Sequence, residues 1–346
     1  MGVTIVLRFY VGASAGAAGG TCPRRWAPRR LLNVLPIDAA RANALKTDWD
    51  NLAIPVPWFI GRRFARPTMA DLLPHLNWVP FFAAHDLAGP FPALLEHPVH
   101  GARARALHDR ARWVLAELAK TSAFAPHGAY GFWPANSVDD DILVYKDDAR
   151  ASVLVRLHAL RQQQIPDEGQ PSLSVADFVA PKASFAPDYI GAYALSLGID
   201  LDGRDDEGLS DEDRRLVAAL VAQLTAAFAQ FVHAQVRRDW AGTDKAPQPP
   251  DDRHPARDVG LRAATGGPVC PDRSEREAIC RLLHTSEIGL AVTDTFALAP
   301  GASEVGLFFA HPQAAPFTLG PIGPDQLADL AARKGVSVEQ AERWLV

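Results

Sequence analysis

The chain has 346 residues, of which 48% are hydrophobic and 22% charged, and its formal net charge at pH 7 is −5. This composition excludes a disordered chain, and the acidic balance argues against nucleic-acid binding as the main function. No segment reaches the ~18 consecutive apolar residues of a membrane span. The three cysteines form no CxxC pair, which indicates neither a disulfide framework nor a structural zinc site, so we expect a cytoplasmic protein.

Residues 1–35 are predicted to be a poorly ordered extension of a single domain that spans residues 36–346. Within the extension, a glycine-rich run at 12–20 follows a strand-like segment, as in a phosphate-binding loop. Such a loop requires a helix directly after it, and here Pro23 interrupts the chain instead. Arg8 lies inside the apolar segment and no basic region precedes it, which argues against a signal peptide.

The first strong helical pattern covers residues 101–120, where apolar side chains recur at helical spacing and arginines occupy the other face. Alternating apolar residues then predict strands at 142–144 and 153–157. The triple carboxylate Asp139–Asp141 precedes the first of them. Three successive carboxylates do not readily converge on one metal ion, so we interpret this segment as a solvated turn.

A buried strand is predicted at 189–197, and an acidic loop follows it at 200–213. Ser210 is a favourable N-cap for the longest helix, 211–238, and a Pro- and Asp-rich exposed loop covers 244–258.

The C-terminal part begins with Asp272 and Glu275, which resemble a capping box that opens a helix ending near residue 284. Two short helices close the chain, and Ser337 caps the second. They could form a DNA-reading helix-turn-helix, but the acidic last segment favours a pair docked on the domain. These elements predict an α+β fold in which long helices pack on mainly antiparallel strands. The remaining strand candidates are 288–298, 304–310 and 315–322.

General catalytic motifs give no mechanism, because the sequence contains no GxxxxGK[ST], GxSxG or HExxH. His97 and His100 form an HxxH, but a proline lies between them and no third ligand is evident, so we interpret them as a loop pair. Cys270 lies between two prolines, and no base can be assigned to it from sequence.

Eleven strings, in the same order along the chain, resemble the C-terminal activation domain of cobalamin-dependent methionine synthase, and the resemblance covers about residues 36–346. Chance would have to place each string independently, so their common order identifies the family. The strings are Lys46–Trp49, Trp78–Phe82, Gly131–Ser137, Leu160–Gln163, Asp177–Lys182, Asp188–Ala192, Cys270–Asp272, Pro300–Ser303, Phe309–Pro312, Ala332–Gly335 and Glu342–Leu345.

The resemblance implies a C-shaped domain with a bent antiparallel sheet and a shallow groove for S-adenosylmethionine. It also implies that the domain presents the methyl group of this ligand for the reductive methylation of cob(II)alamin, with one electron from a flavodoxin-like or similar donor. S-adenosylmethionine carries an ammonium, a sulfonium and a carboxylate. An arginine suits the carboxylate, and acidic side chains suit the positive groups.

The ligand site is carried over from the family's motif, in which an arginine precedes Gly-Tyr and then Pro-x-Cys-Pro. Arg262 and Gly266 match that motif, whereas Gly267 replaces the tyrosine. Phe308 and Phe309 stand where the family has a Tyr-Phe pair before its His-Pro string. The resemblance therefore implies that Arg262, Gly266, Phe308 and Phe309 contact the ligand.

Further departures from the family lie on the ligand side. Asn77 stands where the family has an acidic residue, and it remains a candidate ligand contact as a hydrogen-bond acceptor for an ammonium. Ala226 replaces a glutamate of the long helix, and Arg273 replaces a histidine. Losing one charge-assisted hydrogen bond costs roughly 1.5–3 kcal/mol, so these changes weaken the predicted binding of S-adenosylmethionine.

The family's cobalamin-binding domain carries a DxHxxG string, and this sequence has none. The chain is therefore expected to reach cobalamin only through a separate cobalamin-binding methionine synthase chain. Three functions stay open: a reactivation module that binds S-adenosylmethionine, a non-catalytic docking module that has lost this ligand, and a binder of another small molecule in a pocket lined by Arg262, Phe308 and Phe309.

Overall fold

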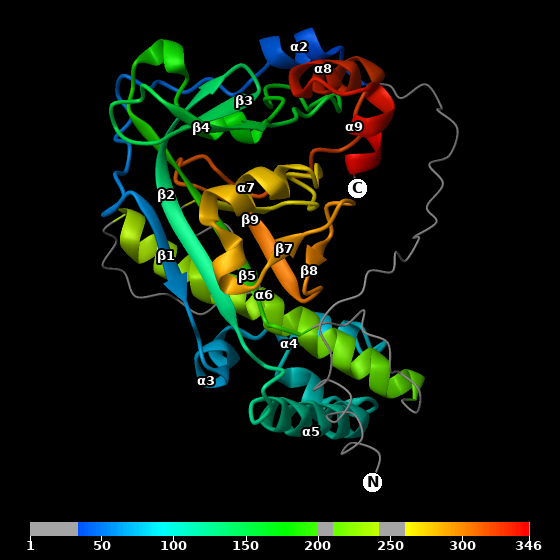
Figure 1. The fold of residues 1–346 in the computed structure, drawn as a ribbon. Coiled ribbons are helices and arrows are strands. Elements are labelled where there is room, and N and C mark those ends of the chain that lie inside the picture. Colours follow the sequence, from blue (N-terminus) through cyan, green and yellow to red (C-terminus); the bar gives the residue numbers. More distant parts are fainter. Residues whose placement is uncertain (1–33, 200–209, 242–259, 346) are drawn as a thin grey trace.

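The computed structural model describes residues 34–199, 210–241 and 260–345. The predicted N-terminal extension lies almost wholly outside these residues, as do the predicted loop at 244–258 and most of the acidic loop before Ser210. The described part forms one large sheet with helices on both faces, which confirms the predicted α+β fold with a mainly antiparallel sheet and long helices (Figure 1).

The main sheet has seven strands, and all of its pairings are antiparallel. The order is β4-β3-β2-β5-β9-β6, and β1 pairs with the part of β2 that β3 leaves uncovered. β2 is the longest strand, and in Figure 1 it runs from beside β4 down past β1. The strands are β1 Gly61–Ala65, β2 His127–Val138, β3 Asp141–Tyr145, β4 Val153–His158, β5 Asp188–Ser196, β6 Leu261–Ala264 and β9 Ser303–Phe309.

Helix α6, Asp211–Ala241, covers one face of the sheet. Ser210 caps it as predicted, because the Ser210 hydroxyl accepts the Asp213 N–H at 3.1 Å. By length and composition alone α6 could cross a membrane, but 61% of its most apolar 18-residue window is buried within the fold. Its buried stripe packs in one cluster with Tyr193 and Phe308 of the sheet, as expected of a core helix. The other helices on this side are α3 Met69–Leu72, α4 Trp78–Ala83 and α5 Gly101–Leu118.

Helix α7, Glu275–Leu283, covers the opposite face of the sheet. Alanines of β2, β5 and β6 lie on this face and allow close packing. The predicted capping box is wrong. Asp272 accepts the N–H of Ser274, while the buried Glu275 side chain pairs instead with Lys334 and His158. A capping box needs a free glutamate at this position, and the buried cation outcompetes the backbone N–H.

Only part of the predicted C-terminal strand pattern is present among the described residues. The segment 288–298 contains one short strand and the start of another, β7 Ala291–Val292 and β8 Leu298–Ala299, and 304–310 is essentially β9. The segment 315–322 is not a strand. Pro316 and Pro321 have no N–H to donate, so a regular ladder cannot form there. Short 3₁₀ helices occur at Leu73–His75, Ala93–Glu96, Val175–Phe178, Lys182–Ser184 and Thr285–Ile288.

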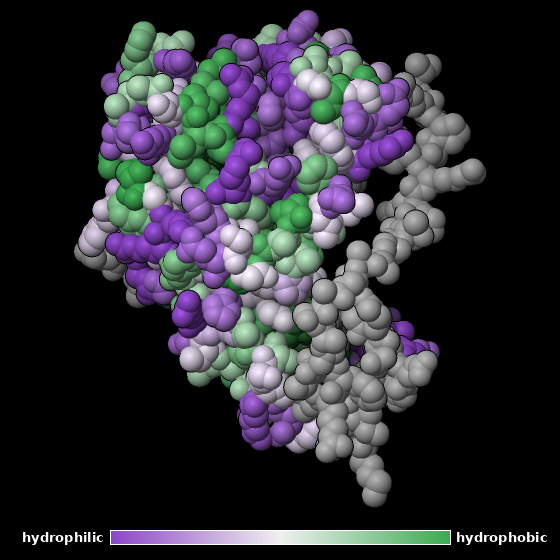
Figure 2. All heavy atoms as spheres, in the orientation of Figure 1, coloured by the Kyte–Doolittle hydropathy of each residue, from purple (hydrophilic) through white to green (hydrophobic). Residues whose placement is uncertain are grey.

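Three helices gather at one end of the sheet: α2 Ile37–Ala42, α8 Pro324–Lys334 and α9 Val338–Trp344 (Figure 1). Gly335 ends α8 in a left-handed conformation, and Ser337 forms the predicted capping box with Gln340. The two last helices pack on each other through a small apolar cluster, as the docked-pair interpretation predicts. Figure 2 shows a mixture of hydrophilic and apolar residues on the surface at this end.

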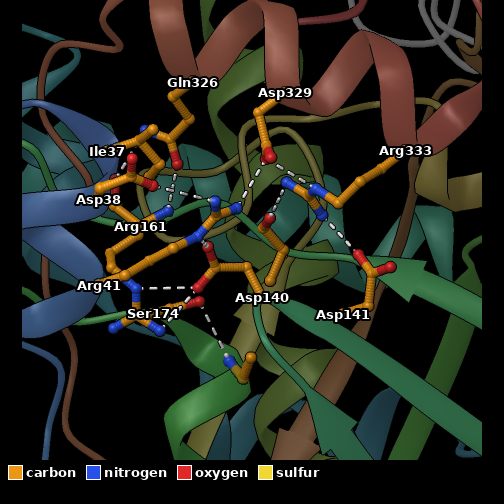
Figure 3. Close-up of polar contacts among 12 residues, drawn as sticks. Ile37, Asp38, Arg41, Asp140, Asp141, Arg161, Ser174, Gln326, Asp329 and Arg333 are labelled. Atoms are coloured by element: carbon orange, nitrogen blue, oxygen red, sulfur yellow. Dashed lines mark hydrogen bonds and ion pairs between the residues drawn. The ribbon is translucent and has the colours of Figure 1, made fainter.

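A buried ion network joins this end of the sheet to α2 and α8 (Figure 3). At its centre Arg161 is only 3% exposed. Its guanidinium donates to Asp140 at 2.8 Å, to both oxygens of Asp177 at 2.7 and 2.8 Å, and to the Ser172 carbonyl at 2.8 Å. Burial alone would lower the pKa of Arg161, but the two carboxylates outweigh it and raise that pKa.

The network extends outward through two further arginines. Arg41 of α2 donates to Asp140 and to Asp329 of α8, each at 2.8 Å. Arg333 of α8 bonds Asp141 and Asp329. The first described helix is thus held directly to α8 by shared carboxylates.

The network also corrects the predicted solvated turn at Asp139–Asp141. Only Asp139 is an exposed turn residue, with a left-handed φ of 52°. Asp140 is 1% exposed and Asp141 is 3% exposed, and both are paired with arginines. The sequence alone predicts solvent exposure for three successive aspartates, because the arginines that pair with two of them come from segments that are distant along the chain.

Candidate functional site

The candidate site lies at the free edge of β6, the last strand of the sheet. Among the described residues, strand β6 pairs only with β9, with Arg262 opposite Phe308 and Ala264 opposite Gly306. Side chains alternate along a strand, so Leu261 and Ala263 enter the core under α7, whereas Arg262 projects from the other face. A residue that projects from an edge strand can meet a ligand without breaking the core.

A pocket of about 370 Å³ lies along this edge. The segment at 316–318 forms the outer wall of the pocket. The next residue, Leu319, donates its N–H to the carbonyl of Pro268, which lies on the opposite wall, at 2.9 Å. The pocket thus lies beside the segment wrongly predicted to be a strand, where a regular ladder would have filled the space. Its lining consists of Leu261, Arg262, Ala263, Ala264, Gly267, Pro268, Val269, Pro316, Phe317 and Thr318.

The backbone of β6 faces this pocket with alternate residues. The Thr265 N–H donates to Val305 at 2.9 Å, so Thr265 directs its backbone groups toward β9. Ala263, two residues earlier, does the same, and the groups of Arg262 and Ala264 therefore point away from β9. The Ala264 carbonyl already accepts the Gly267 N–H at 3.2 Å, which leaves the N–H and carbonyl of Arg262 and the N–H of Ala264 for a ligand. A flat heteroaromatic ring with donor and acceptor positions can pair with such an edge.

Arg262 is half-buried, and its side chain is 21% exposed. Its Nη1 donates to Glu304 Oε1 at 3.2 Å, and the buried Tyr193 hydroxyl donates to the same oxygen at 2.6 Å. Burial and the neighbouring Glu304 carboxylate raise the pKa of Tyr193 well above its usual value, so this hydroxyl stays a donor. Arg262 is therefore a strand residue with an acidic partner.

The two predicted phenylalanines are both 2% exposed and lie on opposite faces of β9. Phe308 shares the face of Arg262, where its ring packs on Tyr193 and His233 at centroid distances of 4.7 and 5.2 Å. Phe309 packs on Phe178 in the other core. Neither side chain belongs to the described lining of the pocket at β6, and the two cannot meet one ligand on the same face of the sheet.

Gly266 holds the turn that follows β6. Its φ of 79° is left-handed, its N–H donates to the Cys270 carbonyl at 2.7 Å, and an added Cβ would lie 2.8 Å from Arg276. The backbone conformation therefore favours glycine here, whatever the residue contributes to a ligand. The neighbouring Gly267, which lines the pocket, has an ordinary φ.

The remaining predicted contact, Asn77, is an exposed residue at the N-terminus of α4. Its side-chain oxygen accepts the Val79 N–H at 3.0 Å, so it acts as a helix cap. Asn77 is not among the described residues that line the β6 pocket.

The surroundings of Cys270 disfavour its nucleophilic thiolate form. Burial, together with the negative charges of Glu275 and Asp272, raises the pKa of the Cys270 thiol to about 12. Its neighbours Glu275 and Asp272 hold Lys334 of α8 at 2.5 and 2.8 Å, so this cluster fastens α8 to the start of α7. The described residues contain no group of three or more His, Cys, Asp or Glu side chains that could hold a metal ion.

The fold and the pocket place the chain in a known class of domain. The family model of the vitamin B12-dependent methionine synthase activation domain matches residues 68–335, and the chain belongs to this family. Within that class, the chain is similar to a solved structure of the MetH reactivation domain bound to AdoHcy (S-adenosylhomocysteine). The two share 35% sequence identity at a TM-score of 0.83, over 90% of this chain and 97% of that chain. The resemblance identified from the ordered strings is confirmed.

Sequence reasoning did not find Glu304 or Tyr193 as part of this site. Glu304 is 42 residues from Arg262, and a single glutamate in a strand carries no motif. Alternation along β5 and β9 would have placed both residues on one face, but which face carries Arg262 depends on the pairing of β6 with β9.

Proposed function

We propose that this chain binds S-adenosylmethionine in the pocket at the β6 edge and presents its methyl group to cobalamin held by a separate chain. The observation that carries the proposal is Arg262, which matches the family's motif and lines a pocket at the free edge of the sheet. Membership of the activation-domain family and the AdoHcy complex of the similar structure support it.

The residues of the pocket fit the ligand in three respects. The guanidinium of Arg262 can bind the carboxylate of the methionine moiety through charge-assisted hydrogen bonds. The outward N–H and carbonyl of Arg262 and the N–H of Ala264 can pair with the edge of adenine. Gly267 has no side chain, so it leaves the mouth of the pocket open for the ribose or the sulfonium.

When bound, S-adenosylmethionine supplies the methyl group, and reductive methylation of cob(II)alamin on a partner consumes that group with one electron from a flavodoxin-like or similar donor. The contribution of this chain is to hold the sulfonium in a fixed place and orientation. Two freely diffusing reactants would lose entropy in the reaction step itself, whereas here that entropy is lost earlier, when the ligand binds.

The test is calorimetric titration of the full chain with S-adenosylmethionine and with S-adenosylhomocysteine, beside Arg262→Ala. Removing one charge-assisted contact is expected to weaken binding about 10- to 150-fold. Arg156→Ala is the matched control, because Arg156 is a half-exposed arginine that pairs with Asp141 away from the pocket. Wild-type protein that gives no heat and no thermal shift at ~10 mM ligand, well beyond the millimolar affinities of weak complexes, would overturn the proposal.

The second candidate is a docking module that contacts a cobalamin-binding chain without S-adenosylmethionine. Ala226 and Gly267 favour it, because each lacks the ligand-side group of the family's motif. This candidate predicts binding to a cobalamin-loaded partner chain that is insensitive to Arg262→Ala and to added ligand. Fluorescence anisotropy with labelled partner, with and without S-adenosylmethionine, separates the two functions.

A further inference from the structure

Three strands bring a cation, an anion and a fixed donor to one point on the sheet. Arg262 comes from β6, Glu304 from β9 and Tyr193 from β5, and all three project from the face that α6 covers. Both neighbours of Glu304 donate to the same oxygen, Oε1. The second oxygen, Oε2, has no hydrogen-bond donor among the described residues, and the Glu304 side chain is 25% exposed.

The space that this arrangement needs is provided by Gly306. An added Cβ at Gly306 would lie 2.7 Å from the Tyr193 hydroxyl and 2.4 Å from the Ala263 carbonyl. Tyr193 and Gly306 are directly opposite each other in the sheet, so the glycine lets the tyrosine ring lie flat toward Glu304. The carboxylate is thereby held by a buried side chain instead of by solvent.

Arg262 also has unused hydrogen-bonding capacity. Only its Nη1 is paired, with Glu304, as far as the structure describes the chain. A guanidinium presents five N–H donors, and the remaining ones can bind a carboxylate from the pocket side. Arg262 and Glu304 together thus present an unfilled cationic position and an unfilled anionic position next to each other.

We propose that Arg262 and Glu304 form a receptor for an α-amino-acid zwitterion, in which the ligand carboxylate binds Arg262 and the ligand ammonium binds Glu304 Oε2. The proposal rests on the proposed function, because S-adenosylmethionine carries this zwitterion on its methionine moiety. Glu304 becomes the acidic group on the ligand side that Ala226 and Asn77 do not supply. Tyr193 acts as a positioning residue, which holds Oε1 and leaves Oε2 without a donor among the described residues.

The proposal is tested by a pair of ligands that differ in the zwitterion. S-adenosylhomocysteine contains it, whereas 5′-methylthioadenosine keeps the adenosine and the thioether but lacks the ammonium and the carboxylate. Glu304→Gln is expected to weaken binding of S-adenosylhomocysteine about 10-fold or more, the loss of one charge-assisted hydrogen bond, and to leave 5′-methylthioadenosine within 2-fold of wild type. Tyr193→Phe is expected to give a smaller loss of the same selectivity.

Glu287→Gln is the matched control, because Glu287 is an exposed glutamate that pairs with Arg62. It should change neither affinity, and urea unfolding of each variant shows whether the fold is kept. Equal affinities of wild type and Glu304→Gln for S-adenosylhomocysteine would overturn the receptor while leaving the proposed function intact. Equal weakening of both ligands would also overturn it, since Glu304 would then only support the pocket. Failure of wild type to bind either ligand would instead overturn the proposed function.

Discussion

Two arginines in this molecule pair with carboxylates under opposite conditions. Arg161, beneath α8, is almost wholly buried, and Asp140, Asp177 and a carbonyl occupy every nitrogen of its guanidinium. Arg262, at the β6 edge, is half-buried and donates to Glu304 through one nitrogen among the described residues. The same pair of functional groups therefore has two roles. A buried guanidinium whose nitrogens are all hydrogen-bonded forms a structural clamp. A guanidinium that is only partly hydrogen-bonded and lies beside a pocket can still bind a ligand.

The largest expected effect comes from breaking the clamp. Arg161→Ala would leave the buried carboxylates of Asp140 and Asp177 without their main partner, so we expect the free energy of unfolding to fall by about 3–5 kcal/mol. Urea denaturation measures this loss. Arg156→Ala, which removes a half-exposed partner of Asp141, should cost no more than about 1 kcal/mol. Similar losses in the two variants would show that burial does not distinguish the two pairs.

His311 offers a test of burial without a charged partner. Burial lowers its pKa to about 4. The neutral ring accepts the Gln313 N–H at Nδ1 and lies 3.2 Å from the Thr47 hydroxyl at Nε2. Between pH 6.5 and 4 the unfolded chain takes up a proton that the folded chain does not, so the free energy of unfolding falls with falling pH, by up to about 3 kcal/mol.

The measurement is a series of urea titrations from pH 7 to pH 4. His311→Asn keeps an acceptor for the Gln313 N–H but cannot titrate, so its stability should depend less on pH over that range. An unchanged slope in the variant would mean that other groups cause the dependence.

The affinity of the pocket for its ligand should rise when an aromatic ring is added to its lining. Gly267→Tyr places an aromatic side chain at a residue that lines the pocket, where an aromatic contact is worth about 0.5–1.5 kcal/mol, or roughly 2- to 10-fold in affinity for S-adenosylhomocysteine. An added Cβ lies 3.0 Å from the Ala264 carbonyl, so the turn must yield by a few tenths of an ångström. Calorimetry compares this variant with Gly267→Ala, which adds the Cβ alone and should gain nothing. A gain in both variants would assign the effect to the backbone.

The smallest expected effect completes the comparison of the two arginines. Arg262→Ala removes a partly exposed pair, in which the two side chains are 21% and 25% exposed, so the free energy of unfolding should change by about 1 kcal/mol, even though ligand affinity falls. Thermal and urea unfolding in the absence of ligand provide the measurement. A loss as large as that expected for Arg161→Ala would make Arg262 a structural residue and remove the contrast.

The elements that sequence predicted well are those with a regular pattern on one face. Helices α5 and α6, strand β5 and the caps at Ser210 and Ser337 follow from apolar spacing and from hydroxyl side chains at helix starts. β2 was not predicted, although it is the longest strand. It is buried on both faces, so it shows no alternation, and it contains Pro134. This proline lies where the neighbour of β2 changes from β1 to β3, a place where a strand tolerates one.

The parts of the site that could not be predicted depend on long-range pairing. Arg262 was identified through its motif, but its partner Glu304 was not, because only the register of β6 on β9 brings them together. The capping box at Asp272 and Glu275 was wrongly predicted for the same reason, because Glu275 pairs with Lys334 of α8, which is 59 residues away in sequence. Short-range rules fail where a distant charge competes for the same side chain.

The contacts between α2 and α8 have a consequence for the order in which the protein folds during synthesis. The Ile37 N–H donates to Asp325 at 2.6 Å across 288 residues, and Arg41 reaches Asp329 over the same separation. A nascent chain leaves the ribosome amino end first, so α2 emerges long before its partners exist. Until α8 has been synthesised, Arg41 and Asp141 lack their α8 partners, and this end of the sheet stays incomplete. Completion of this end of the sheet therefore waits until α8 has been synthesised.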